Sequence, residues 1–267
     1  MISVEGINIS FLERGASVDP TILLLHGLGD CARSWDNFSQ SMSDKFRIIS
    51  LDSRGHGDSG KSPSGRYLLD DYVVDLKAVE KKLGLGSFVL VGHGNGGRIA
   101  LRYTHKNPNK VRGLVIADSN LSPKNDSQIH SLLDIKGNLD DDSSEPFVDI
   151  LKTRQPLSSN EMLLHQADAL TMISKEGIRT WKHDVAVMKG EDPSDLWEQW
   201  RNLKCPTLLL RGRQSNVVSH EEAVRMKENL VSCSLVELEG GGHWLYQESP
   251  GSFESATRWF IEKYKLI

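Results

Sequence analysis

The stretch VLVGHGNGGR, residues 89–98, is the first in the chain whose residue types and spacing suggest chemistry. A run of β-forming apolar residues ends at a cluster of glycines, and a segment with helical spacing follows. A strand, a sharp turn and a helix in this order can present one side chain at the tip of the turn, where it can attack a substrate. The residue at the tip is Gly94, which has no side chain. The turn has the form that positions a nucleophile, but the nucleophile is missing.

Polar residues that could take part in chemistry lie at or after the ends of other expected strands. His243 lies in GGGHWLYQESP at 240–250, Asn216 in RGRQSNVVS, and Asp118 at the end of VRGLVIADS. A histidine ring titrates near neutral pH and can act as a base when a second group orients it. The amide oxygen of Asn216 could accept a hydrogen bond from such a ring, but it carries no charge to stabilise an imidazolium. Asp118 could orient a histidine or equally cap a loop, so the sequence leaves both partners open.

The elements that must position these residues follow an alternating pattern. Near-continuous apolar runs are typical of strands buried on both faces of a parallel sheet, and they occupy 21–27, 46–52, 88–94, 111–119 and 206–212. A further strand is expected at 233–243 and an early antiparallel one at 7–15. Helical patterns over 68–84, 96–108, 219–230 and 252–266 separate or follow the strands. The pattern predicts an α/β fold, with a mostly parallel central sheet flanked by helices.

The alternation stops between about residues 121 and 203. This segment shows no convincing strand; it begins polar and continues with helical patterns. It is too long for a simple connection. We therefore expect a helical lid at 121–203, inserted between two strands of a core formed by 1–120 and 204–267.

Composition and charge exclude several classes of function. The net charge of −4 gives no general attraction for nucleic acid or for an anionic membrane, and no apolar run approaches the roughly 20 residues that span a bilayer. The first residues lack a signal peptide, and the cysteines, which we expect to be packing residues, include no Cys-x-x-Cys; both features favour a cytoplasmic protein. The scattered histidines indicate no metal site, and the glycine spacing at 92–97 does not match a dinucleotide loop. We expect no cofactor and a small-molecule substrate or ligand.

Four motifs in order, LLLHGLGD, LDSRGHGDSG, VGHGNGGR and GGGHWLYQESP, together resemble the α/β-hydrolase superfamily over essentially the whole chain. The resemblance is to its lidded esterases, lactonases and C–C hydrolases. It implies that Gly94 stands at the nucleophile position, that His243 is the base and that Asn216 stands at the usual acid position. In some members the acid instead follows the strand that ends at Asp118. The resemblance also implies an oxyanion hole formed by the backbone amides of two residues, Leu28 and Asn95.

Three hypotheses follow from this altered set of residues. The first is an enzyme without a covalent step, in which His243 is a general base and the two amides stabilise an oxyanion on an ester, a lactone or an acidic ketone. The second is a noncatalytic pseudo-hydrolase that binds a small apolar ligand. The third is an ordinary serine hydrolase in which the nucleophile has been changed to Gly94. We favour the first; the substrate and the oligomeric state cannot be read from the sequence.

Overall fold

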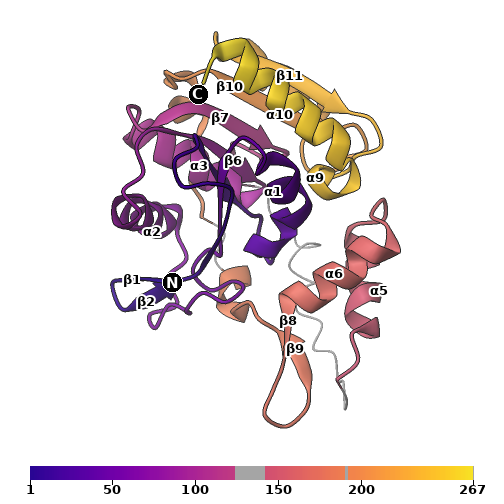
Figure 1. Ribbon diagram of the computed structural model, residues 1–267. Coiled ribbons are helices and arrows are strands. Elements are labelled where there is room, and N and C mark those ends of the chain that lie inside the picture. Colours follow the sequence, from indigo (N-terminus) through magenta and orange to yellow (C-terminus); the bar gives the residue numbers. More distant parts are fainter. Residues whose placement is uncertain (124–141, 190–191, 267) are drawn as a thin grey trace.

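A seven-stranded sheet forms the centre of the computed structural model, which describes residues 1–123, 142–189 and 192–266 (Figure 1). The strands lie in the order β11-β10-β7-β6-β4-β5-β3, and all neighbours are parallel except β3 and β5. Their bounds are β3 Phe11–Arg14, β4 Thr21–Leu25, β5 Arg47–Leu51, β6 Phe88–His93, β7 Val111–Ala117, β10 Thr207–Gly212 and β11 Cys233–Leu238. The prediction of a mostly parallel α/β sheet is confirmed.

Both faces of the sheet are buried, which explains the near-continuous apolar runs. Successive side chains along a strand point to opposite faces. In β4, Leu23 and Leu25 therefore join one core cluster, while Ile22 and Leu24 join the other.

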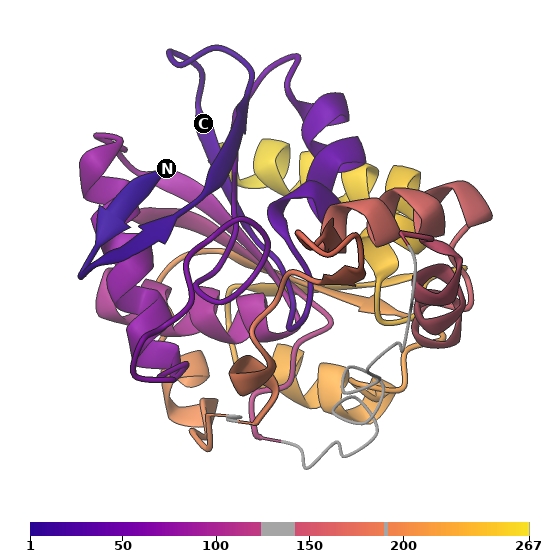
Figure 2. The ribbon, with the colours of Figure 1, turned by 90° about the horizontal axis from the view of Figure 1, so that it is seen from below.

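Helices cover each face (Figures 1 and 2). Buried residues of α2, α3 and α8 pack in the cluster on one face, and those of α1, α9 and α10 pack in the cluster on the other. The bounds are α1 Asp36–Met42, preceded by the 3₁₀ helix η1 Ala32–Trp35, α2 Leu69–Lys82, α3 Asn95–Lys106, α8 His220–Glu228, α9 Leu245–Glu248 and α10 Pro250–Tyr264. The four helices expected in the core are present, and each of their ends lies within two residues of the expected position.

The expected strand at 7–15 is in fact two strands. β2 (Ile7–Ile9) forms an antiparallel hairpin with β1 (Ile2–Val4), whereas β3 pairs antiparallel with β5. The break falls at Ser10, whose N–H donates to Ser59 Oγ at 2.8 Å instead of to a neighbouring strand.

The chain between β7 and β10 contains α5 (Glu145–Arg154), α6 (Asn160–Leu170), the strands β8 (Thr171–Ile173) and β9 (Arg179–Trp181), the 3₁₀ helix η2 (Val185–Lys189) and α7 (Trp197–Arg201). We call residues 142–189 of it the inserted segment. The expectation that no strand occurs here is wrong, because β8 and β9 pair as an antiparallel hairpin. Most of the polar part of the expected lid, residues 124–141, lies outside the described residues. In Figure 1, α5 and α6 lie at the lower right, beneath α9 and α10, and the hairpin extends to the bottom of the view.

Within the described ranges, no helix has the length and apolar character needed to cross a bilayer.

Candidate active site

The turn between β6 and α3 has the strained backbone of a nucleophile-bearing turn. Gly94 lies at φ 52° and ψ −119°, in a region that residues with a side chain rarely adopt. The neighbouring glycines are needed for close packing: a Cβ on Gly92 would collide with the carbonyl of Gly96, and one on Gly96 would collide with the carbonyls at the end of β4. A Cβ on Gly94 would instead meet its nearest atoms at 3.5 Å, an ordinary contact. The space at position 94 therefore accommodates a side chain that the sequence does not supply.

His243 lies opposite this turn, in the loop after β11. Its Nδ1 is 2.7 Å from Oδ2 of Asp118, which is fully buried at the end of β7. Its other edge faces Gly94, because a Cβ built at that position would lie 3.5 Å from both Cε1 and Nε2. A carboxylate accepts only from a protonated nitrogen, so Nδ1 carries the proton and Nε2 presents a lone pair in the neutral ring.

Two hydrogen bonds, besides the one with His243, help to hold Asp118 in place. Its backbone N–H donates to the Leu210 carbonyl at 2.8 Å, and its φ of 46° turns the side chain out of the strand direction. Ser215 Oγ donates to Oδ2 at 2.6 Å. Asn216, the other candidate partner, has an exposed side chain, while Asp118 accepts the bond from Nδ1. The structure therefore pairs His243 with Asp118 and not with Asn216, and Ser215, which sequence reasoning missed, donates to the same carboxylate oxygen.

The ring of His243 is also fixed from its flanks. The His93 ring lies 4.4 Å away between centroids, and the Trp244 ring packs edge-on at 4.7 Å. Nε2 of His93 donates to the backbone carbonyl of His243 at 2.9 Å. Burial, and then the nearby His243, hold the pKa of His93 well below its usual value. His93 thus stays neutral and holds the backbone that carries the candidate base.

The two residues whose amides are expected to form an oxyanion hole line the same cavity. Leu28 follows β4, and Asn95 is the first residue of α3; both line a cavity with Gly94, Asp118 and His243. The N–H groups in the first turn of a helix, such as that of Asn95, have no acceptor within the helix, and the helix dipole favours negative charge there.

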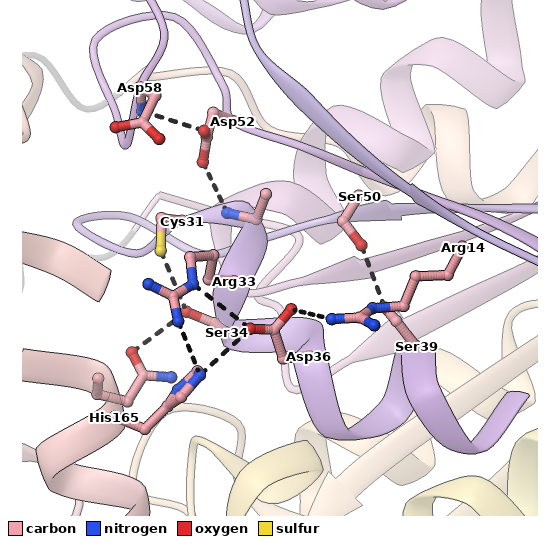
Figure 3. Close-up of polar contacts among 12 residues, drawn as sticks. Arg14, Cys31, Arg33, Ser34, Asp36, Ser39, Ser50, Asp52, Asp58 and His165 are labelled. Atoms are coloured by element: carbon pink, nitrogen blue, oxygen red, sulfur yellow. Dashed lines mark hydrogen bonds and ion pairs between the residues drawn. The ribbon is translucent and has the colours of Figure 1, made fainter. Parts of the chain in front are cut away.

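The inserted segment contacts the core through His165 (Figure 3). Nε2 of His165, on α6, lies 3.2 Å from Asp36 and 3.4 Å from Arg33, at the start of α1 and in η1. Two of its residues, Arg154 of α5 and Val187 of η2, line the cavity. Sequence reasoning identified neither Arg154 nor Trp244 as part of the site.

Cys31, which follows the LLLHGLGD motif, is not suited to attack a substrate. Its side chain is buried, and burial followed by the carboxylate of Asp30 raises the pKa of its thiol far above the usual value. A thiol of this kind is not a ready nucleophile. All three cysteines are reduced and buried, in line with their expected packing role. Among residues 1–123, 142–189 and 192–266, no three side chains of the metal-binding types gather into a cluster.

The comparisons with known proteins agree with the fold described above. The family model for the alpha/beta hydrolase fold matches residues 20–250. The chain belongs to the α/β-hydrolase fold family. It is 26% identical to 2-(acetamidomethylene)succinate hydrolase from Mesorhizobium japonicum, over 98% of this chain and 94% of that protein. It is also 26% identical to the sn-1-specific diacylglycerol lipase ABHD11 of Mus musculus, over 92% of this chain and 82% of the lipase.

A solved structure of E-2-(acetamidomethylene)succinate hydrolase superposes with a TM-score of 0.85 and 25% identity, covering 97% of this chain and 96% of that one. The relatives named here are hydrolases, and the resemblance seen in the four sequence motifs is confirmed as family membership.

Proposed function

We propose that this α/β-hydrolase-family protein hydrolyses a small carbonyl-containing substrate without a covalent intermediate. His243 is the general base, Asp118 orients it, and the amides of Leu28 and Asn95 stabilise the oxyanion. The observation that carries the proposal is the pairing of His243 with a buried carboxylate on one edge while its other edge faces the space beside Gly94. A histidine kept only for packing does not need a buried carboxylate aligned with one nitrogen.

In the proposed reaction, water occupies the place of the missing nucleophile. Nε2 of His243 takes one proton from this water as its oxygen adds to the carbonyl carbon, and the carbonyl oxygen becomes an oxyanion. The tetrahedral species then expels the leaving oxygen, which receives the proton from Nε2. One water is consumed, one acyl bond is broken, and the histidine returns to its starting state.

Asp118 contributes by stabilising the imidazolium that forms during the first step. Because its carboxylate is buried and bonded to Nδ1, it favours both the correct tautomer and the positive charge on the ring. A general base of this kind contributes about 10²–10⁴-fold to a rate. This magnitude suits activated substrates, such as aryl esters, lactones and thioesters, better than amides.

The known activities of two relatives support hydrolysis at a carbonyl group. Their names assign to one the hydrolysis of 2-(acetamidomethylene)succinate and to the other that of diacylglycerol. We treat the inserted segment as a lid, because α5 and η2 contribute residues to the cavity wall. On an acidic ketone, the same histidine would remove a proton, and the same two amides would stabilise the resulting enolate.

The test is the turnover of a panel of small aryl esters, lactones and acidic ketones by the native chain and by two variants. His243→Ala removes the base. His220→Ala is the matched control, since His220 is an exposed histidine that pairs with Glu237 on the surface. We expect turnover by the native chain and by the control, with a loss of at least about 10²-fold in His243→Ala. Saturable binding of panel members without product from the native chain would contradict the proposal and support the noncatalytic alternative.

A further inference from the structure

Arg154 is a charged side chain buried in the wall of the cavity that contains His243 and Gly94. It is the last residue of α5 and is only 9% exposed. Its guanidinium carbon lies 5.1 Å from the centre of the Trp244 ring, and that ring lies 4.7 Å from the His243 ring. Because the two distances share the Trp244 ring, the guanidinium lies within about 10 Å of the candidate base.

Among the described residues, no side chain forms a hydrogen bond or an ion pair with the guanidinium of Arg154, and no carboxylate lies within 4.0 Å of it. Its close contact is with the face of the Trp244 ring. The other buried arginines of the described chain are paired: Arg54 binds Asp75 through two bonds of 2.6 and 2.7 Å, and Arg211 binds Glu237 at 2.7 Å. Burying an arginine without an ionic partner is costly, and an aromatic ring offsets only part of that cost. The contact with Trp244 leaves the hydrogen-bond donors of Arg154 unused by the described residues.

The groups around Arg154 leave its charge available to a ligand. Asp30 attracts it from a distance, but its oxygens accept bonds from Tyr246 Oη at 2.6 Å and from the Cys31 N–H at 3.0 Å. Burial, and then the charge of Arg154, lower the pKa of His183 to about 4, so this neighbour is neutral. Burial lowers the pKa of Arg154 to about 10, which still leaves it protonated at neutral pH.

A second arginine that lines the cavity, Arg98, differs from Arg154 because its guanidinium donates hydrogen bonds to backbone carbonyls. Arg98 donates to the backbone carbonyls of four residues in the loops at either end of the inserted part of the chain, Asn120, Leu121, Asp192 and Ser194. Its guanidinium ties these loops together. Arg154 makes no such bonds, so a structural explanation of this kind does not apply to it.

We propose that Arg154 binds a carboxylate of the substrate, so that the substrate is a short organic acid carrying the reacting carbonyl a few bonds from its carboxylate. A planar guanidinium binds a carboxylate through two parallel hydrogen bonds and fixes its orientation. Trp244 contacts both the guanidinium and the ring of the candidate base, so the two groups lie within one small site. What happens to the bound acid rests on the proposed function; the binding itself does not.

Calorimetric titration with succinate tests the binding separately from catalysis, with succinamide as the neutral analogue. Arg154→Gln removes the charge, and Lys152→Gln, an exposed lysine on the same helix, is the matched control for loss of one positive charge. We expect the native chain and the control to bind succinate and not succinamide, and Arg154→Gln to bind at least about tenfold more weakly. Arg154→Lys should bind with intermediate affinity.

Thermal melting of each variant checks folding. Loss of an unpaired buried charge should leave Arg154→Gln at least as stable as the native chain.

Two outcomes would overturn the anion site: no heat from succinate, malonate or glutarate with the native chain, or equal binding by native and Arg154→Gln. Rates on monomethyl succinate and on methyl butyrate then separate this inference from the proposed function. If both esters are hydrolysed equally fast, the hydrolase proposal stands and the anion site fails. If succinate binds through Arg154 but no ester is hydrolysed, the anion site stands and the hydrolase proposal fails.

Discussion

Gly94→Ser should convert the proposed water-based site into one with a covalent nucleophile. The new Cβ fits without collision, since its nearest neighbours are the His243 ring atoms at 3.5 Å and Gly27 Cα at 3.7 Å. A hydroxyl one bond further on can reach hydrogen-bond distance of Nε2 in a suitable rotamer. Because Asp118 already orients His243, we expect the single substitution to complete a Ser–His–Asp set, with no change at Asn216.

The cost of the substitution comes from the backbone and not from packing. A side chain at φ 52° costs about 1–3 kcal/mol in folding free energy. For a domain of this size, each kcal/mol lowers the melting temperature by roughly 2–4 °C. Gly94→Ala is the matched control, because it introduces the same strain without a hydroxyl. Both variants should melt several degrees below the native chain.

A fluorophosphonate probe, read by intact mass, distinguishes the variants. We expect one probe per chain on Gly94→Ser, and none on the native chain, on Gly94→Ala or on Gly94→Ser combined with His243→Ala. An aryl ester should also give an acyl-enzyme burst with Gly94→Ser alone. A folded Gly94→Ser protein that resists the probe would refute the alignment of His243 with position 94.

Three further predictions follow from single residues. Asp118→Asn should lower kcat/KM by about 10²–10⁴-fold at unchanged melting behaviour, because an amide N–H facing Nδ1 favours the wrong tautomer of His243; a loss below tenfold would contradict the orienting role. Gly92→Ala should lower the free energy of unfolding in urea by about 3 kcal/mol, more than Gly94→Ala does, because its Cβ has no room; equal losses would contradict the packing described. The pKa of His183 is about 4 in the fold against 6.5 unfolded, so its contribution to stability is complete above pH 6.5 and is lost as the pH falls toward 4. Between pH 7.5 and 5, His183→Gln should therefore lose about 2 kcal/mol less than the native chain in urea unfolding, and parallel losses would show that His183 does not titrate in this way.

Much of the fold could be predicted because the strands of a parallel sheet are buried on both faces. Short apolar runs such as TILLLHG and PTLLLRG fit few structures other than a buried strand, and β4 and β10 lie where these runs predict. The hairpin β8–β9 was not predicted because its strands are not buried on both faces. Met172 and Ile173 are half exposed, so they give no alternation, and their apolar character extends that of the preceding helix. Gly177, with a φ of 81°, marks the turn and was the available signal.

The site was predictable in its parts but not in its pairing. Asp118 and Asn216 follow neighbouring strands of the sheet, β7 and β10, and residue type alone does not show which one reaches His243. Asp118 has a positive φ of 46°, a conformation that aspartate adopts more often than most residues, but its residue type alone does not predict that conformation at this position. Arg154 could not be recognised because a basic residue in the last turn of a helix is ordinary, and only burial without a partner sets it apart.

The most direct test of the central claim is intact-mass analysis of the native chain while it turns over an aryl ester, with product release followed in the same mixture. Direct attack by water predicts linear product formation without a burst and an unmodified protein mass throughout. It also predicts that His243→Ala forms no product above the uncatalysed rate. An acyl adduct on the native chain, or product formation that survives His243→Ala, would contradict the account.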